Sequence, residues 1–227
     1  MNPPTGMLFS LEGIDGSGKS LQRVMAGSDI RKLFPAIEIV ETWEPGYTDI
    51  GSRIRRLILE KHKFREGDPS PMTLALMILA DRAEHVARIV APALSRGSVV
   101  ITDRFSDSTV CYQGYGAGVD LSMLQIIINE IMRVNGLHNL DYPFTTIYFD
   151  IEPDVAKSRI RKNERWDDAS GDFRRRVFDG YRNMVTANSN RVVAIDAGKT
   201  VLEVKQQIVD IIAPRVEAHY GVSRRVF

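Results

Sequence analysis

The stretch from Met7 to Ser20 reads M-L-F-S-L-E-G-I-D-G-S-G-K-S and joins an apolar run to the phosphate-binding loop pattern G-x-x-x-x-G-K-S. The apolar run predicts a strand, and the pattern requires a helix after the loop. Glycines let backbone N–H groups turn inward around phosphates, while Lys19 reaches the terminal phosphates and Ser20 offers its hydroxyl to Mg²⁺. We therefore predict a nucleoside triphosphate site built by Gly13, Ile14, Asp15, Gly16, Ser17, Gly18, Lys19 and Ser20.

Apolar runs rich in β-forming residues recur along the chain and alternate with segments of helical periodicity. The expected strands span 8–11, 37–42, 99–102, 145–149 and 192–195. The expected helices span 18–33, 49–62, 72–95, 120–135, 153–163, 173–189 and 200–217. This alternation predicts an α/β fold of three layers, in which helices cover both faces of a five-stranded parallel sheet within a single domain over residues 1–227.

The composition limits the partners and compartments to be expected. A net charge near +1 over 227 residues gives no general reason to expect nucleic acid or an anionic membrane as a partner. The single cysteine, Cys111, excludes an internal disulfide and suits a reducing compartment. The sequence shows neither a transmembrane run nor the features of a signal peptide. We expect a cytoplasmic protein that binds neither nucleic acid nor membrane.

Two charged residues follow the third expected strand. Ligands of open parallel sheets bind at the carboxyl ends of the strands, and Asp103 and Arg104 stand at such an end. The run V-V-I-T-D has the form of a Walker B strand, whose carboxylate would act with Ser20 on Mg²⁺ and its water shell. Alternatively, Asp103 caps the next segment. Arg104 can clamp a substrate phosphate through two hydrogen bonds.

A charged run, R-I-R-K-N-E-R-W-D-D-A-S-G-D-F-R-R-R, spans Arg159 to Arg176. In isolation such a run indicates a solvated helix face. This run lies between the fourth and fifth expected strands, where residues 160–172 can close over the triphosphate as a lid. A lid would bring arginines to the phosphoryl group in transfer, and the sequence leaves both interpretations open.

Taken together, these motifs resemble those of the thymidylate kinases, a family of the P-loop nucleoside monophosphate kinase group. The matching segments are E-G-I-D-G-S-G-K-S from Glu12, W-E-P-G-Y-T from Trp43, A-D-R-A-E-H from Ala80, D-R-F-S-D-S-T-V-C-Y-Q-G from Asp103 and F-R-R-R-V-F-D-G-Y from Phe173. The resemblance covers nearly the whole chain. It implies a P-loop kinase fold, a homodimer, and a reaction in which ATP and dTMP give ADP and dTDP with Mg²⁺.

The resemblance also implies which residues take part in the phosphoryl transfer. Lys19 and Arg104 would neutralise charge on the transferring group. Because Gly16 leaves the loop without the arginine that some members of the family carry there, Arg161 and Arg165 of the lid would have to supply that charge. The implied catalytic residues are therefore Lys19, Arg104, Arg161 and Arg165.

The same resemblance implies an acceptor pocket for dTMP. Asp15 would lie near the sugar 3′ hydroxyl, and Arg55 would join Arg104 on the acceptor phosphate. Arg82 would read the thymine O4, and Tyr112 would crowd the 2′ carbon and so disfavour ribonucleotides. The implied substrate-binding residues are Asp15, Trp43, Arg55, Ile78, Arg82, Arg104, Ser108, Thr109 and Tyr112.

The chain departs from the family pattern in four places. Ile78 replaces a phenylalanine that stacks on thymine, and such stacking is worth about 1–3 kcal/mol per base. Leu21 replaces a hydroxyl residue after the loop lysine, Trp43 replaces an arginine, and Tyr47 replaces a glycine. Trp43 could supply the aromatic surface that Ile78 lacks, or the two aromatic residues could pack in the core.

Four alternative functions are weighed against this interpretation. A deoxynucleoside kinase would need a general base such as Glu44, because a sugar hydroxyl must lose a proton to attack. A kinase for another pyrimidine monophosphate would share most of the site. A regulatory GTPase is not favoured, since the chain has no N-K-x-D guanine motif. A nucleotide-binding relative without catalysis is the remaining alternative.

Overall fold

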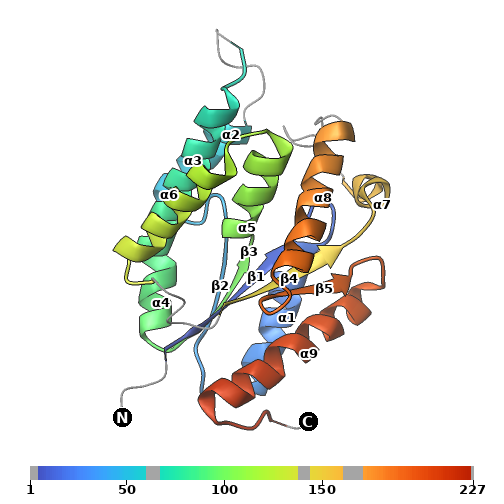
Figure 1. The fold of residues 1–227 in the computed structure, drawn as a ribbon. Coiled ribbons are helices and arrows are strands. Elements are labelled where there is room, and N and C mark those ends of the chain that lie inside the picture. Colours follow the sequence, from blue (N-terminus) through green and yellow to red (C-terminus); the bar gives the residue numbers. More distant parts are fainter. Residues whose placement is uncertain (1–4, 60–66, 138–143, 161–170, 226–227) are drawn as a thin grey trace.

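The computed structural model describes residues 5–59, 67–137, 144–160 and 171–225 (Figure 1). Its centre is a five-stranded sheet in the order β2-β3-β1-β4-β5, in which all neighbouring strands are parallel. The strands are β1 (Met7–Glu12), β2 (Ile39–Trp43), β3 (Val99–Asp103), β4 (Phe144–Asp150) and β5 (Val192–Asp196). The five strands predicted from the sequence are confirmed, with ends that differ by one or two residues. Parallel strands bring the ends of β1, β2 and β3 to one edge.

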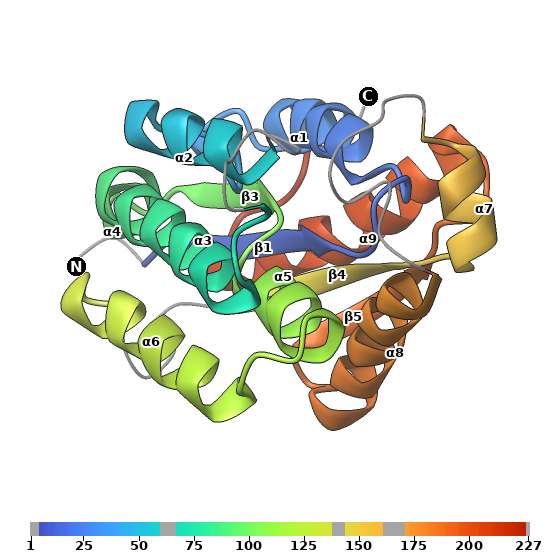
Figure 2. The same ribbon diagram turned by 90° about the horizontal axis from the view of Figure 1, so that it is seen from above.

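Helices cover both faces of the sheet, which confirms the predicted layers (Figures 1 and 2). The α-helices are α1 (Lys19–Leu33), α2 (Asp49–Leu59), α3 (Pro71–His85), α4 (Ala91–Ser95), α5 (Ser106–Thr109), α6 (Leu121–Val134), α7 (Pro153–Ser158), α8 (Gly171–Ala187) and α9 (Val201–Tyr220). Two wider π-helical segments are η1 (Val86–Val90) and η2 (Val110–Gly116). Figures 1 and 2 show α2, α3, α4 and α6 gathered on one side, at the left of both views.

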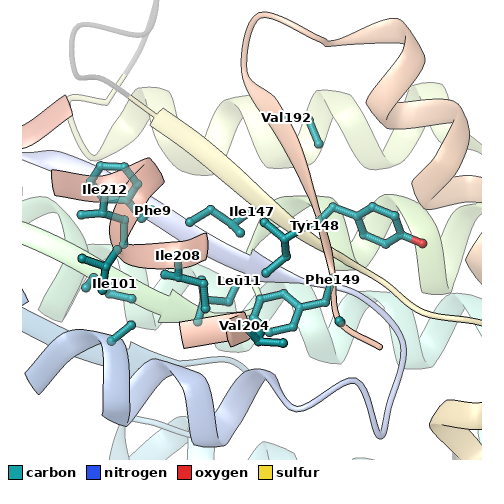
Figure 3. Close-up of a cluster of buried hydrophobic side chains, with 14 of the residues drawn as sticks. Phe9, Leu11, Ile101, Ile147, Tyr148, Phe149, Val192, Val204, Ile208 and Ile212 are labelled. Atoms are coloured by element: carbon teal, nitrogen blue, oxygen red, sulfur yellow. The ribbon is translucent and has the colours of Figure 1, made fainter. Parts of the chain in front are cut away.

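The strand side chains alternate between two buried clusters. On β1, Phe9 and Leu11 pack with Ile208 of α9, and Figure 3 shows this cluster between the sheet and the helix. Leu8 points to the opposite face and packs with residues of α3, α4 and α6. Because both faces of β1 are buried, its sequence is a continuous apolar run rather than an alternating one.

Local signals fix the ends of several helices. Ser70 accepts a hydrogen bond from the backbone N–H of Thr73, and Pro71 occupies the first position of α3. Thr200 and Glu203 form a reciprocal capping box at the start of α9. Such short-range contacts explain why the predicted starts of these helices agree with the structure within one residue.

Two helical predictions were wrong. The helical run formed by α5 and η2 was not predicted, because its Ser, Thr and Gly residues are poor helix formers and burial against other elements stabilises it instead. The helix expected over 153–163 ends at Ser158, where Arg159 and Ile160 form turns by donating to carbonyls three residues earlier. The helix expected over 72–95 is present, although a π-helical segment interrupts it.

The predicted lid over 160–172 lies mostly outside the described residues, as do Arg161 and Arg165. Gly171 and Asp172, at its end, form the first turn of α8. Within the ranges that the structure describes, no helix combines the length and the apolar character needed to cross a membrane.

Candidate active site

The loop between β1 and α1 has the backbone of a phosphate-binding loop. Gly16 and Gly18 adopt positive φ angles of 82° and 96°, which side chains other than glycine rarely tolerate. A Cβ atom built on Gly16 would lie 2.1 Å from the backbone oxygen of Ala156 in α7. The loop therefore packs directly against α7, and position 16 has no room for any side chain.

Lys19 is buried beneath this loop. Its Nζ donates to the backbone oxygen of Ile14 at 2.8 Å and to Oγ of Ser17 at 3.2 Å. Burial and the nearby Arg104 guanidinium lower the pKa of Lys19 to about 8. A polyphosphate in the loop would favour the charged ammonium again, so Lys19 is suited to hold an anion there.

Ser20 and Asp103 meet at the start of α1, as predicted for a metal site. The Ser20 Oγ donates to Oδ2 of Asp103 at 2.5 Å, while Oδ1 of Asp103 is buried and has no hydrogen-bond partner in the described part of the chain. A hydroxyl beside a carboxylate with one unpaired oxygen fits Mg²⁺, which takes one or two protein oxygens and keeps several waters. No cluster of three or more His, Cys, Asp or Glu side chains suited to a metal occurs among the described residues. Asp103 does not cap a helix, because α5 begins three residues later.

Arg104 follows Asp103 in a left-handed conformation, with φ of 69°. This conformation costs about 1–3 kcal/mol for a residue other than glycine and turns the side chain back toward the loop. Its guanidinium donates to Oδ1 of Asp15 at 2.6 Å and lies over the ring of Tyr112, 4.7 Å from the centroid. Burial disfavours the Asp15 carboxylate, but Arg104 and Lys19 hold the pKa of Asp15 below its usual value.

A pocket with about 100 Å³ of free volume opens beside this turn. Arg55, Arg82 and Arg104 contribute to its wall, together with the carboxylates of Asp15 and Glu44. The predicted residues that line it together are Asp15, Arg55, Ile78, Arg82, Arg104, Ser108 and Tyr112. Three arginines against two carboxylates leave the wall with a net positive charge.

Arg82 is almost fully buried in the wall of the pocket. Its guanidinium uses four of its five N–H groups, on Oε2 of Glu44 twice, on Oγ1 of Thr109 and on the backbone oxygen of Phe105. One N–H on Nη1 has no partner among the described residues. Thr109, one of the predicted substrate-binding residues, is buried, does not line this pocket and accepts a hydrogen bond from Arg82.

Glu44 is buried between two cationic or polar partners. Oε2 accepts from Arg82, and Oε1 lies 2.8 Å from Nδ1 of His85, whose Nε2 contacts Thr42. Burial opposes the charge, but Arg82 and His85 hold the pKa of Glu44 below its usual value. Both oxygens are engaged, so Glu44 is poorly suited to be the general base that a deoxynucleoside kinase needs.

Trp43 does not lie on the wall of the acceptor pocket. It lines a larger cleft of about 1040 Å³ that also includes Lys19, Ser20 and Asp103. Its ring is 37% exposed and meets Tyr47 edge-on at 4.6 Å, while the Arg23 guanidinium lies 5.0 Å from its centroid. This position does not support the prediction that Trp43 replaces the missing aromatic surface near Ile78, and it also places Trp43 outside the core.

Several residues in and behind the site were not predicted from the sequence, among them Gln113 and Glu12. Gln113 of η2 is buried in the wall of the acceptor pocket, and its signal was the Y-Q-G at the end of a matching segment. Glu12, the last residue of β1, is fully buried and accepts three hydrogen bonds behind Arg104. Its signal was a lone carboxylate at the end of an apolar strand, directly before the loop.

Comparison with known proteins agrees with this geometry. A family model described as thymidylate kinase matches residues 11–208. The chain is 37% identical over 213 residues to a thymidylate kinase of Synechococcus sp. (strain JA-3-3Ab), covering 93% of this chain and 98% of that protein. It is 37% identical over 218 residues to a thymidylate kinase of Chlorobaculum tepidum, covering 91% and 96%.

A solved structure gives the same answer for the fold. The crystal structure of thymidylate kinase from Ehrlichia chaffeensis superposes with a TM-score of 0.72 at 28% identity, covering 92% of this chain and 99% of that one. The family model matches most of the chain, and the phosphate loop, the Asp103-Arg104 turn and the Arg82 pocket fall within the matched residues. The chain belongs to the thymidylate kinase family.

Proposed function

We propose that this protein transfers the γ-phosphoryl group of ATP to the phosphate of dTMP, giving ADP and dTDP. The observation that carries the proposal is the convergence of Arg55, Arg82 and Arg104 on one pocket beside the phosphate loop. An acceptor that is already an anion needs positive charge and alignment rather than a base. The engaged carboxylate of Glu44 agrees with such an acceptor.

In the proposed phosphoryl transfer, the described residues would bind the two nucleotides and neutralise the charge on the transferring group. The loop glycines and Lys19 would hold the β- and γ-phosphates of ATP. Arg55 and Arg104 would hold the dTMP phosphate in line with the γ-phosphorus, and Arg104 would also neutralise charge that spreads over the transferring oxygens. Asp15, which Arg104 holds, would accept a hydrogen bond from a sugar hydroxyl.

Ser20 and Asp103 would hold Mg²⁺ through the hydroxyl and the unpaired carboxylate oxygen. When bound, Mg²⁺ would supply positive charge beside the triphosphate. Arg161 and Arg165 stay predicted lid arginines, because no described residue bears on their position.

One assay tests the proposal and its rivals. ADP release is measured with dTMP, dUMP, UMP, dCMP, AMP and thymidine as acceptors, with Lys19→Ala as the control for activity that does not come from this site. We expect dTMP to give the highest kcat/KM and Lys19→Ala to remove release with every acceptor. Preferred turnover of thymidine would replace the proposal with a deoxynucleoside kinase, and preference for another monophosphate would change the base.

A second copy of the chain is the proposed partner, as the resemblance implies. Exposed apolar side chains on the neighbouring helices α3 and α6 support it, namely Met72, Leu76, Ile126 and Val134. Light scattering on the purified protein measures the mass directly. A cytoplasmic location without nucleic acid is proposed from the near-neutral charge and the single cysteine.

A further inference from the structure

Glu12 is a fully buried carboxylate that touches none of the expected ligand positions. Its Oε1 accepts the backbone N–H of Phe105 at 2.6 Å. Its Oε2 accepts the hydroxyls of Ser108 at 2.6 Å and Tyr181 at 2.8 Å. These three donors come from the turn after β3, from α5 and from α8, so one side chain joins three separate elements behind the active site.

The donor Phe105 N–H belongs to the peptide that follows Arg104, the residue with positive φ. Two further bonds hold the same turn. The Arg104 N–H donates to the backbone oxygen of Leu11 at 3.0 Å, and the Thr102 hydroxyl donates to the Arg104 backbone oxygen at 2.8 Å. The Glu12 side chain and the Leu11 backbone oxygen thus hold the turn through hydrogen bonds on both sides of the Arg104 α-carbon.

The direction of the Arg104 side chain depends on these hydrogen bonds to its turn. It donates to the backbone oxygen of Gly13 at 3.2 Å, to Oγ of Ser108 at 3.0 Å and to Oδ1 of Asp15 at 2.6 Å. Ser108 is therefore held by Glu12 and in turn contacts Arg104. A strained backbone persists when several contacts of its surroundings hold it in place. Glu12 supplies two such contacts, because it bonds both the peptide N–H after Arg104 and the Ser108 hydroxyl.

We propose that Glu12 is a positioning residue of the acceptor site, which fixes the Arg104 turn and thereby aims the guanidinium at the acceptor phosphate. The proposal rests on the function proposed above. Glu12 acts through Arg104 and Ser108 and does not itself reach the substrate.

The test compares Glu12→Leu with Glu12→Gln. Leucine has a similar volume and carries no charge, so burial favours folding while all three acceptor contacts are lost. We expect kcat/KM for dTMP to fall about 100-fold, as for a small misplacement of a catalytic group, with KM for ATP changed less than about twofold. Glutamine can accept from Phe105 and donate to the two hydroxyls, so we expect it to recover activity to within about tenfold of the wild type.

A matched control is Asp107→Asn. Asp107 is also a buried carboxylate of this region, but it pairs with Arg191 at 2.8 Å and accepts from Thr146 at 2.6 Å rather than from the Arg104 turn. We expect this variant to lose stability and to keep kcat/KM for dTMP within about threefold. An equal loss of activity in both variants would assign the effect to general destabilisation and overturn the proposal.

A double mutant tests whether Glu12 acts through Arg104. In an Arg104→Ala background, Glu12→Leu should change kcat/KM by less than about twofold, because the group that it positions is gone. An undiminished 100-fold loss would overturn the proposal. Should Glu12→Leu fail to fold, Tyr181→Phe remains, which removes one of the three hydrogen bonds on Glu12, and an unchanged kcat/KM for dTMP in that variant would overturn the proposal. A wild-type protein that does not phosphorylate dTMP would instead overturn the proposed function.

Discussion

Glu12 and Glu44 are both buried glutamates at the carboxyl end of the sheet, but their surroundings differ. Glu12 accepts only neutral N–H and O–H donors, and burial together with the nearby Asp107 carboxylate raises its pKa to about 7. Glu44 accepts from the Arg82 guanidinium, and its pKa lies below the usual value despite burial. The site therefore has a compensated end, where the Arg82 guanidinium bonds Glu44, and an uncompensated end, where Glu12 has no cationic hydrogen-bond partner among the described residues.

The largest expected effect, on the free energy of unfolding, comes from removing the ion pair between Arg82 and Glu44. Arg82→Met leaves Glu44 buried without its guanidinium, and removal of one partner of such a pair costs about 3–5 kcal/mol. The free energy of unfolding in urea measures the loss. Combining Arg82→Met with Glu44→Gln should restore part of it, since no uncompensated charge remains. A double mutant as unstable as the single one would contradict the compensation.

The raised pKa of Glu12 predicts that the free energy of unfolding depends on pH. The pKa of Glu12 is about 7 in the folded protein against 4.5 for the free group, so the folded protein binds the extra proton between these values. The resulting stabilisation is complete below about pH 4.5 and is lost as the pH rises through about 7. It amounts to at most about 3 kcal/mol, from about 1.4 kcal/mol per pKa unit.

Urea unfolding at intervals between pH 5 and pH 8 measures this slope. Glu12→Gln should flatten most of the slope, while Glu44→Gln should keep the share that comes from Glu12, because the pKa of Glu44 lies below this window. Asp81 adds a slope of the same sign, since burial and the Glu44 charge raise its pKa to about 6, and Asp81→Asn identifies that share. A slope that Glu12→Gln leaves intact would show that Glu12 is ionised throughout.

The two ends should also differ in activity, by a smaller amount. Glu44→Gln removes a charge that takes no part in proton transfer, so phosphorylation of dTMP should fall less than about tenfold, or about 1.4 kcal/mol. Initial rates with saturating ATP measure the loss. A drop of several orders of magnitude would return Glu44 to the role of general base and would favour a deoxynucleoside kinase.

The smallest expected effect concerns the base. Ile78→Phe should tighten dTMP binding if the base lies against this side chain, because it adds an aromatic face. The gain from stacking, about 1–3 kcal/mol, is offset by overpacking in a pocket of about 100 Å³, so the net change should stay below about 1 kcal/mol. Calorimetric titration with dTMP measures it. Trp43→Ala, in the neighbouring cleft, is the control and should leave dTMP affinity unchanged.

The parts of the site that could be predicted from sequence are those set by local geometry. The loop from Gly13 to Ser20 and the carboxylate of Asp103 have fixed positions relative to their strands, so their meeting follows from a parallel sheet. The contact of Thr109 with Arg82 could not be predicted, because the direction of its hydroxyl depends on the helical run that follows Phe105. The run formed by α5 and η2 is helical because it is buried, and a sequence of poor helix formers does not predict this.

Glu12 could not be assigned for a related reason. Its three donors are 93, 96 and 169 positions away in the chain, and only the packing of α5 and α8 brings them together. The position of Trp43 likewise depends on its contacts with Tyr47 and Arg23 rather than on its place after a strand. Long-range polar contacts of this kind leave no periodic trace in a sequence.

The contact between Gly16 and the backbone of Ala156 has an evolutionary consequence. Some members of the family carry an arginine at the loop position, but here no single substitution at position 16 could introduce one without a collision with α7. A related chain with an arginine at this position would need the backbone around Ala156 to lie further from the loop. Such an arginine therefore requires two changes, one at position 16 and one in the packing of α7, and a single substitution does not introduce it.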